Sequence, residues 1–210
     1  MDTIVGVILG WLLALLSPVI VEAIKRPRAK RDLERAFFSE LLEIKFRMLG
    51  SVFQLARATR SVDRLLLQWI VAHSDGHESD SVYTETMTSI KQVLGKPEQE
   101  MSIYLKVLGD KAPSSLSLKT YPTPFLDSHI PSLSLFESEF QQKIMDVKSR
   151  INMINQEVEQ NRMYLQLTFQ PISQENHATV SGNLDSSYLF QRNFSKDIVE
   201  RIEQLMNKHA

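Results

Sequence analysis

The side chains whose types and spacing suit chemistry gather in one polar stretch, HSDGHESD, at residues 73–80. In an extended loop, its imidazole and carboxylate groups can converge on a metal ion through nitrogen and oxygen. A metal-dependent hydrolase is therefore one hypothesis. A loop that only joins two helices has the same composition, and metal sites normally take further ligands from distant elements, so no metal or other cofactor is predicted. The candidate ligands are His73, Asp75, His77, Glu78 and Asp80.

Four arginines form the next group. Arg57, Arg60 and Arg64 stand three and four residues apart, and Arg47 precedes them. On one helix face they could receive a phosphate or the acidic surface of a partner. Asp63 and other nearby acids can pair with them, so a solvated helix face is the alternative. Aromatic side chains that stack on bases are missing between these arginines, so nucleic acid is not predicted as a partner.

Composition removes several other classes of chemistry. The chain has no cysteine, which excludes disulfides, thiolate metal sites and cysteine nucleophiles. Its net charge of −1 gives no global field toward nucleic acid or an acidic substrate. The seven glycines form no phosphate-binding pattern, and no nucleophile elbow of the GxSxG type occurs. We therefore predict a protein that is not an enzyme.

The N-terminal segment reads IVGVILGWLLALLSPVIV over residues 4–21. These are about 18 uncharged residues, which at about 1.5 Å each come close to crossing the hydrocarbon of a bilayer. No basic region precedes the segment, so a retained transmembrane anchor over 1–24 is predicted rather than a signal peptide. A basic juxtamembrane segment, 25–35, follows, which by the positive-inside rule places the N-terminus outside and the bulk in the cytoplasm. Its bases, which also suit anionic lipid, are Lys25, Arg26, Arg28, Lys30, Arg31 and Arg35.

Small residues recur every four positions in this segment, at Gly6, Gly10 and Ala14. This pattern lets two transmembrane backbones approach closely and predicts a homo-oligomer, with lipid-facing small residues as the alternative. An oligomerising effector that perturbs the membrane through this helix is a second hypothesis for the function. In layout the chain resembles small single-pass proteins of bacterial inner membranes, a resemblance that covers no motif and implies no activity.

Beyond the anchor, residues 29–210 are predicted to form an all-α cytoplasmic domain. Apolar residues recur at three- and four-residue steps, and stop signals separate the segments. Because each apolar stripe needs another to cover it, we expect an elongated antiparallel bundle with coiled-coil-like packing and a small helical hairpin. The long helices are expected at about 29–72 and 135–170, the short ones at about 82–95 and 97–109, and a terminal helix at about 186–208.

Residues 113–133 contain several prolines, which forbid a continuous helix, yet they are too apolar for a disordered linker. We predict an ordered strap packed against the bundle. Ser134 and Glu137 have the spacing of a capping box for the next helix. Asn161 occupies an apolar position of that helix and is expected on the packing seam, where it must find a partner. The leading hypothesis is a membrane-tethered, non-enzymatic interaction module whose partners are the membrane, another copy of the chain and another protein.

Overall fold

Helices account for every regular element in the part of the chain that the structure describes. The computed structural model describes residues 2–74, 81–110, 116 and 118–208, and it describes side chains for 25–74, 84–108, 116 and 118–208. The predicted all-α class is confirmed for these residues. In chain order the elements are α1 (Asp2–Ala58), α2 (Arg64–Ala72), α3 (Ser81–Leu94), α4 (Glu98–Asp110), α5 (Pro124–Ser128), the 3₁₀ helix η1 (Ile130–Leu135), α6 (Ser138–Leu167) and α7 (Gln174–Asn207).

The predicted membrane anchor, residues 1–24, lies outside the residues whose side chains are described. Its backbone from residue 2 onward forms the first turns of α1, and these turns contain the small residues Gly6, Gly10 and Ala14. Where side chains are described, no helix has a stretch long and apolar enough to cross a bilayer. The anchor, its orientation and its self-association therefore stay predictions.

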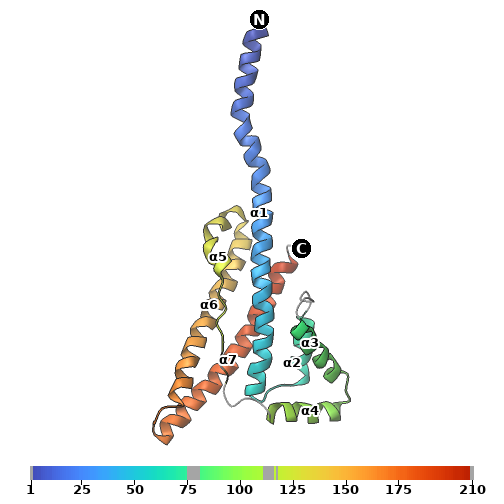
Figure 1. Cartoon of the computed structure of the whole chain (residues 1–210), viewed down its shortest axis with the longest axis vertical. Coiled ribbons are helices and arrows are strands. Elements are labelled where there is room, and N and C mark those ends of the chain that lie inside the picture. Colours follow the sequence, from blue (N-terminus) through green and yellow to red (C-terminus); the bar gives the residue numbers. More distant parts are fainter. Residues whose placement is uncertain (1, 75–80, 111–115, 117, 209–210) are drawn as a thin grey trace.

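Three long helices, α1, α6 and α7, form the body of the molecule. Figure 1 shows α1 and α6 running the same way from the end of the bundle nearest the N-terminus, and α7 running back along both. Apolar side chains from all three meet in one core, as their three- and four-residue spacing predicts. Each fully buried aliphatic or aromatic side chain contributes about 1.5–3 kcal/mol relative to exposure. Fully buried members include Phe37, Met48, Ile144, Ile151, Ile198 and Ile202.

The structure divides the long helix that the sequence predicts over 29–72. α1 ends at Ala58 and a separate helix, α2, begins at Arg64. Gly50 has a low helix propensity, but it lies inside α1 without interrupting the helix. The stop falls instead at Arg60, which has a φ of 53° in the left-handed region.

Hydrogen bonds explain why the chain turns at this position. The N–H of Ser61 donates to the carbonyl of Ala56 at 2.8 Å, and the N–H of Arg60 donates to that of Arg57 at 3.1 Å. This pair of bonds satisfies the last carbonyls of a helix and requires a left-handed residue, which is usually glycine. Asp63 then caps α2 by accepting a backbone N–H at 2.7 Å.

The terminal helix is longer than the predicted 186–208, because α7 begins at Gln174. Ser173 starts it as an N-cap whose hydroxyl accepts the N–H of Asn176 at 3.2 Å. Glu175 in the first turn adds a favourable charge at the positive end of the helix. The first turns are mostly exposed, so the cap begins the helix without an apolar stripe to mark it.

The described part of the strap between α4 and α6, residue 116 and residues 118–133, packs against the bundle, as predicted. It includes the short helices α5 and η1. Each has a proline in its first turn, where no backbone N–H is needed for an intrahelical hydrogen bond. The predicted capping box does not form: the hydroxyl of Ser134 donates to the carbonyl of Pro131 at 2.9 Å, and Glu137 occupies the N-cap of α6. The buried side chains of the strap are Leu118, Tyr121, Thr123, Leu126 and Leu133.

The helices α2, α3 and α4 form a smaller subdomain against the last turns of α1. A separate apolar cluster holds it together. Figure 1 shows it beside and below the last turns of α1, with α4 at the end of the molecule opposite the N-terminus. The members of the cluster are Val52, Ala56, Leu66, Leu67, Ile70, Ile90, Val93 and Met101.

Candidate functional site

The basic residues predicted to face the membrane lie on α1 just beyond residue 24. Six bases and two acids leave a net charge of +4 over residues 25–35. Five of the six bases are exposed, and Lys30 is partly buried. Charge of this sign attracts an anionic surface within roughly a Debye length, about 8 Å at physiological salt. The six are Lys25, Arg26, Arg28, Lys30, Arg31 and Arg35.

The segment formed by α5 and η1 lies beside this basic stretch, at the end of the bundle from which α1 extends toward the N-terminus (Figure 1). The Glu40 carboxylate of α1 accepts the N–H groups of Phe125 at 2.8 Å and Leu126 at 2.9 Å. A carboxylate is favourable there because a helix N-terminus is partially positive. Lys148 of α6 forms an ion pair with Asp127. The segment is therefore tied to both α1 and α6.

Aromatic packing fixes the segment further. The Phe37 ring of α1 lies edge-on to Phe125 with centroids 5.3 Å apart, and it contacts Phe136 at 6.0 Å. The ammonium nitrogen of Lys30 lies 5.5 Å from the centroid of the Phe136 ring. This cation–π contact holds a charged group of α1 directly beside the end of η1.

A hollow of about 390 Å³ opens between the basic stretch and η1. Arg26, Pro27 and Lys30 line it from α1, and Ser134 and Leu135 line it from η1. The lining thus combines two cationic donors with an apolar side chain, and none of these five residues is acidic. This arrangement suits a ligand that carries an anionic group next to an apolar part.

Two acidic side chains near this end are occupied by bases of the bundle. Lys208, followed by Lys143, lowers the pKa of the Glu139 carboxyl from 4.5 to about 2. The hydrogen bond from Lys148 lowers the pKa of Asp127. Both carboxylates therefore remain charged at neutral pH and paired with these lysines of the bundle.

Of the predicted metal ligands, only His73 lies in the described part of the chain. Its Nδ1 lies 2.8 Å from the carbonyl oxygen of Trp69, and its Nε2 lies 3.6 Å from the Glu203 carboxylate. Within the part of the chain that the structure describes, no three acidic, histidine or cysteine side chains are grouped to hold a metal. The metal hypothesis stays a prediction, because its other ligands lie outside the described residues: Asp75, His77, Glu78 and Asp80.

The surroundings of His73 serve to dock α2 on the bundle. Lys45 of α1, only 4% exposed, forms an ion pair with Glu203 of α7 at 2.7 Å. The indole N–H of Trp69 donates to Glu200 at 2.9 Å, and Lys196 lies 4.8 Å from the centroid of that indole ring. Because each of these groups joins two helices, a structural role accounts for them.

The four arginines do not share a helix face, because α1 ends before Arg60. Arg47 donates to a strap carbonyl, that of Thr120, at 3.0 Å. Arg57 donates to a glutamine of its own helix at 3.3 Å, and Arg64 forms an ion pair with α4 at 2.8 Å. These contacts stabilise the fold and direct Arg47, Arg57 and Arg64 to three different partners.

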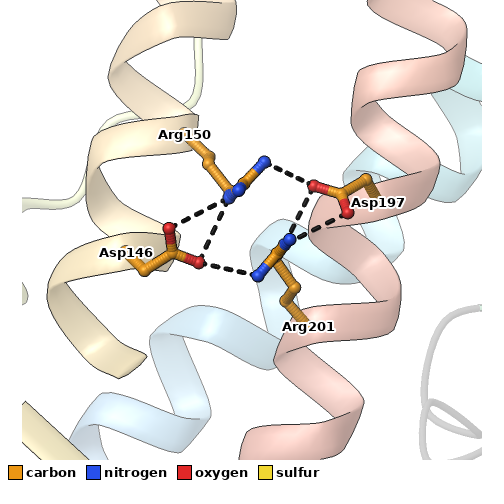
Figure 2. A network of polar contacts seen from close by, with 4 residues as sticks. All are labelled: Asp146, Arg150, Asp197 and Arg201. Carbon is orange, nitrogen blue, oxygen red and sulfur yellow. Dashed lines mark hydrogen bonds and ion pairs between the residues drawn. The ribbon is translucent and has the colours of Figure 1, made fainter. Parts of the chain in front are cut away.

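An ion-pair network that the sequence reading missed joins α6 to α7 (Figure 2). Arg150 lies 2.7 Å from Asp197, and Arg201 lies 3.0 Å from Asp146, while each helix also pairs its own Asp and Arg four residues apart. That repeated spacing was the available signal. Because the four side chains are partly exposed, each pair contributes only about 0–1 kcal/mol, and the network mainly fixes the register of the two helices.

A buried polar seam also joins these helices. Asn161 is 1% exposed and its amide donates to the Ser187 hydroxyl at 3.1 Å, which confirms the predicted seam position and its need for a partner. Ser187 in turn donates to Glu157 at 2.6 Å and accepts from Gln191 at 3.2 Å. The sequence did not predict that polar side chains of α7, including Ser195, are buried. Buried positions were inferred from the spacing of apolar residues, and polar residues do not contribute to that pattern.

Comparison with known proteins adds no assignment. The chain matches no family model, and neither the curated proteins nor the solved structures give a significant match.

Proposed function

We propose that this chain is a membrane-tethered, non-enzymatic helical module that binds another protein. Residues 1–24 anchor it in a cell membrane, of the bacterial inner-membrane type, with the N-terminus outside and the remaining chain in the cytoplasm. The observation that carries the proposal is the continuity of α1. One helix of 57 residues runs from Asp2 through the basic stretch and into the core of the bundle.

This continuity supports tethering because no loop separates the apolar segment from the bundle. Phe37 is fully buried, so the core holds α1 only about 18 Å beyond Lys25, at 1.5 Å per residue. From Lys25 to Ala58 the helix is about 50 Å long. A bundle connected in this way keeps one orientation toward the anchor and holds its far end away from the membrane.

The far end carries the surface on which we expect the protein partner. On α4, Ile103, Tyr104 and Val107 are 66%, 42% and 44% exposed, whereas Met101 is buried. Neighbouring exposed apolar residues on one helix form a surface that a partner can cover with a gain in hydrophobic stabilisation. Distance from the anchor leaves this surface open to a protein in the cytoplasm.

The test is crosslinking in cells, with a photoreactive amino acid in place of Tyr104 in the full-length chain. We expect one defined protein to be captured and identified by mass spectrometry, with or without residues 1–24. Capture should be lost when Ile103→Asp and Val107→Asp are combined. It should persist in Met153→Asp, a matched change at an exposed site on α6. Equal capture by both variants would refute the proposed surface.

The same rigid connection favours a second candidate, an oligomeric membrane effector, because a change in the bundle would pass directly into the anchor. In that case crosslinks form only between copies of this chain and disappear when residues 1–24 are removed. Combined Gly6→Leu and Gly10→Leu would then abolish the oligomer and any toxicity on overexpression. Toxicity that survives these changes would eliminate the effector.

A further inference from the structure

We propose that the hollow between α1 and η1 binds the headgroup phosphate of an anionic phospholipid, with Leu135 and Ile130 immersed beside it. The end of the bundle then lies on the membrane as a second contact, in addition to the anchor. This inference rests on the proposed tethering, and it names the ligand class and the residues that the basic stretch uses.

The position of the hollow along α1 places it close to the membrane surface. At 1.5 Å per residue, Arg26 and Lys30 lie about 8 Å and about 14 Å beyond Val21, the last residue of the uncharged segment. The headgroup layer of a bilayer is about 5–8 Å thick on each side, and long basic side chains reach back toward it. The hollow is therefore at the depth where lipid phosphates lie.

The lining of the hollow has the chemistry that a phosphate group requires. The guanidinium of Arg26 and the ammonium of Lys30 both donate, and a phosphate accepts from such groups through charge-assisted hydrogen bonds. The hydroxyl of Ser134 already donates to Pro131, so the two bases supply the charge and the donors. The contact between Lys30 and Phe136 keeps one of these bases at the rim.

η1 carries exposed apolar side chains at this end of the bundle. Leu135 is 37% exposed and Ile130 is 38% exposed, although both belong to a segment tied to the bundle by Glu40 and Lys148. Apolar side chains next to bases are the pattern of segments that lie in the membrane interface, where they enter the boundary of headgroups and acyl chains. A phospholipid offers both the phosphate and the apolar surface that this end of the molecule can bind.

The absence of cysteine allows a clean test in the full-length chain. A spin label on Leu135→Cys reports depth through its relative collision rates with oxygen and with a water-soluble nickel chelate. Measurements use nanodiscs of phosphatidylcholine alone or with phosphatidylglycerol. We expect membrane-like accessibility in the anionic discs and at least a several-fold shift toward water in the neutral ones. A label on Met163→Cys, 49% exposed near the opposite end of α6, should report water in both.

Charge-matched variants separate the hollow from general attraction. Arg26→Gln with Lys30→Gln should move the Leu135 label into water in anionic discs. Arg28→Gln with Arg31→Gln removes the same charge outside the hollow and should leave the label immersed. Equal effects of the two pairs, or a label in water in anionic discs, would overturn the inference while the chain remains anchored. A chain that fails to enter nanodiscs at all would overturn the tethering and this inference together.

Discussion

The side-chain amide of Asn155 pairs with the main chain of Tyr121 in both directions. The N–H of Tyr121 donates to Oδ1 at 2.7 Å, and Nδ2 donates to the carbonyl of Tyr121 at 3.0 Å. The Tyr121 hydroxyl also donates to Ser51 at 2.6 Å, and burial raises the pKa of this phenol. One residue of the strap is thereby fixed to α6 and α1. Tyr121 lies outside any regular element, so its main chain has no helical hydrogen-bond partners. The Asn155 amide supplies them.

Replacing this amide should loosen the strap. In Asn155→Ala the N–H and carbonyl of Tyr121 lose their partners in a partly buried site, and we expect a loss of about 1–3 kcal/mol in the free energy of unfolding. Urea unfolding of the full chain in mild detergent, monitored by circular dichroism, measures this loss of stability. Asn152→Ala, an exposed position on the same helix, should change stability by less than about 0.5 kcal/mol. Similar losses in both would rule out the pairing as the cause.

The ion pair between Lys45 and Glu203 should respond differently to removal of one partner or both. Glu203→Ala leaves the buried Lys45 ammonium without its carboxylate, which costs about 3 kcal/mol, at the lower end for buried pairs because Glu203 is partly exposed. Adding Lys45→Met removes the uncompensated charge and should restore most of the stability. Denaturant unfolding of the two single variants and the double variant tests this. Additive losses in the double variant would contradict the account.

Arg60 should tolerate glycine better than other exposed residues do. Its φ of 53° is unfavourable for a side chain with a Cβ, so Arg60→Gly should be neutral or stabilising by up to about 1 kcal/mol. Gln54→Gly, exposed inside α1, should lower stability by about 1 kcal/mol. Thermal unfolding compares the two. A destabilisation by Arg60→Gly as large as that of Gln54→Gly would count against the left-handed stop.

The ion pairs of Glu139 should give a pH-dependent contribution. The pKa of this carboxyl falls from 4.5 to about 2 in the folded state, so its stabilisation is complete above about pH 5 and is lost as the pH falls toward 2. Glu139→Gln should therefore lower the melting temperature at pH 6, with the difference from the unmodified chain shrinking toward pH 2. Since the Glu139 side chain is exposed, added salt should also shrink the difference. A difference that is constant over this range would exclude the charge effect.

Periodicity made the apolar elements predictable. The stripe from Phe37 to Leu55 and the stripe from Phe140 to Val158 lie buried where helical spacing places them. Asn161 was identified because it replaces an apolar residue in such a stripe. Residues with an unusual backbone conformation were not predicted in this way, as Arg60 shows by ending α1 in a left-handed conformation without being a glycine. Residues whose partners are distant in the chain were not predicted either.

Only the α1 side of the hollow could be predicted from the sequence. The bases Arg26 and Lys30 are evident from the sequence, but Leu135 lies more than 100 positions further along the chain and is one of many leucines. What brings it to α1 is the cap that Glu40 makes on α5 and the packing of Phe37, and neither pairing leaves a local pattern.

The sequence alone therefore determined the all-helical class, the core faces of the long helices, the ordered strap and the position of the basic stretch. These depend on local spacing and on the composition of single segments. The tertiary structure decided where α1 stops, how far α7 extends, which helices share ion pairs and which side chains stand beside Arg26 and Lys30. Each of these depends on a partner far away in the chain or on a cap that outweighs local propensity, and such partners exist only once the helices have packed.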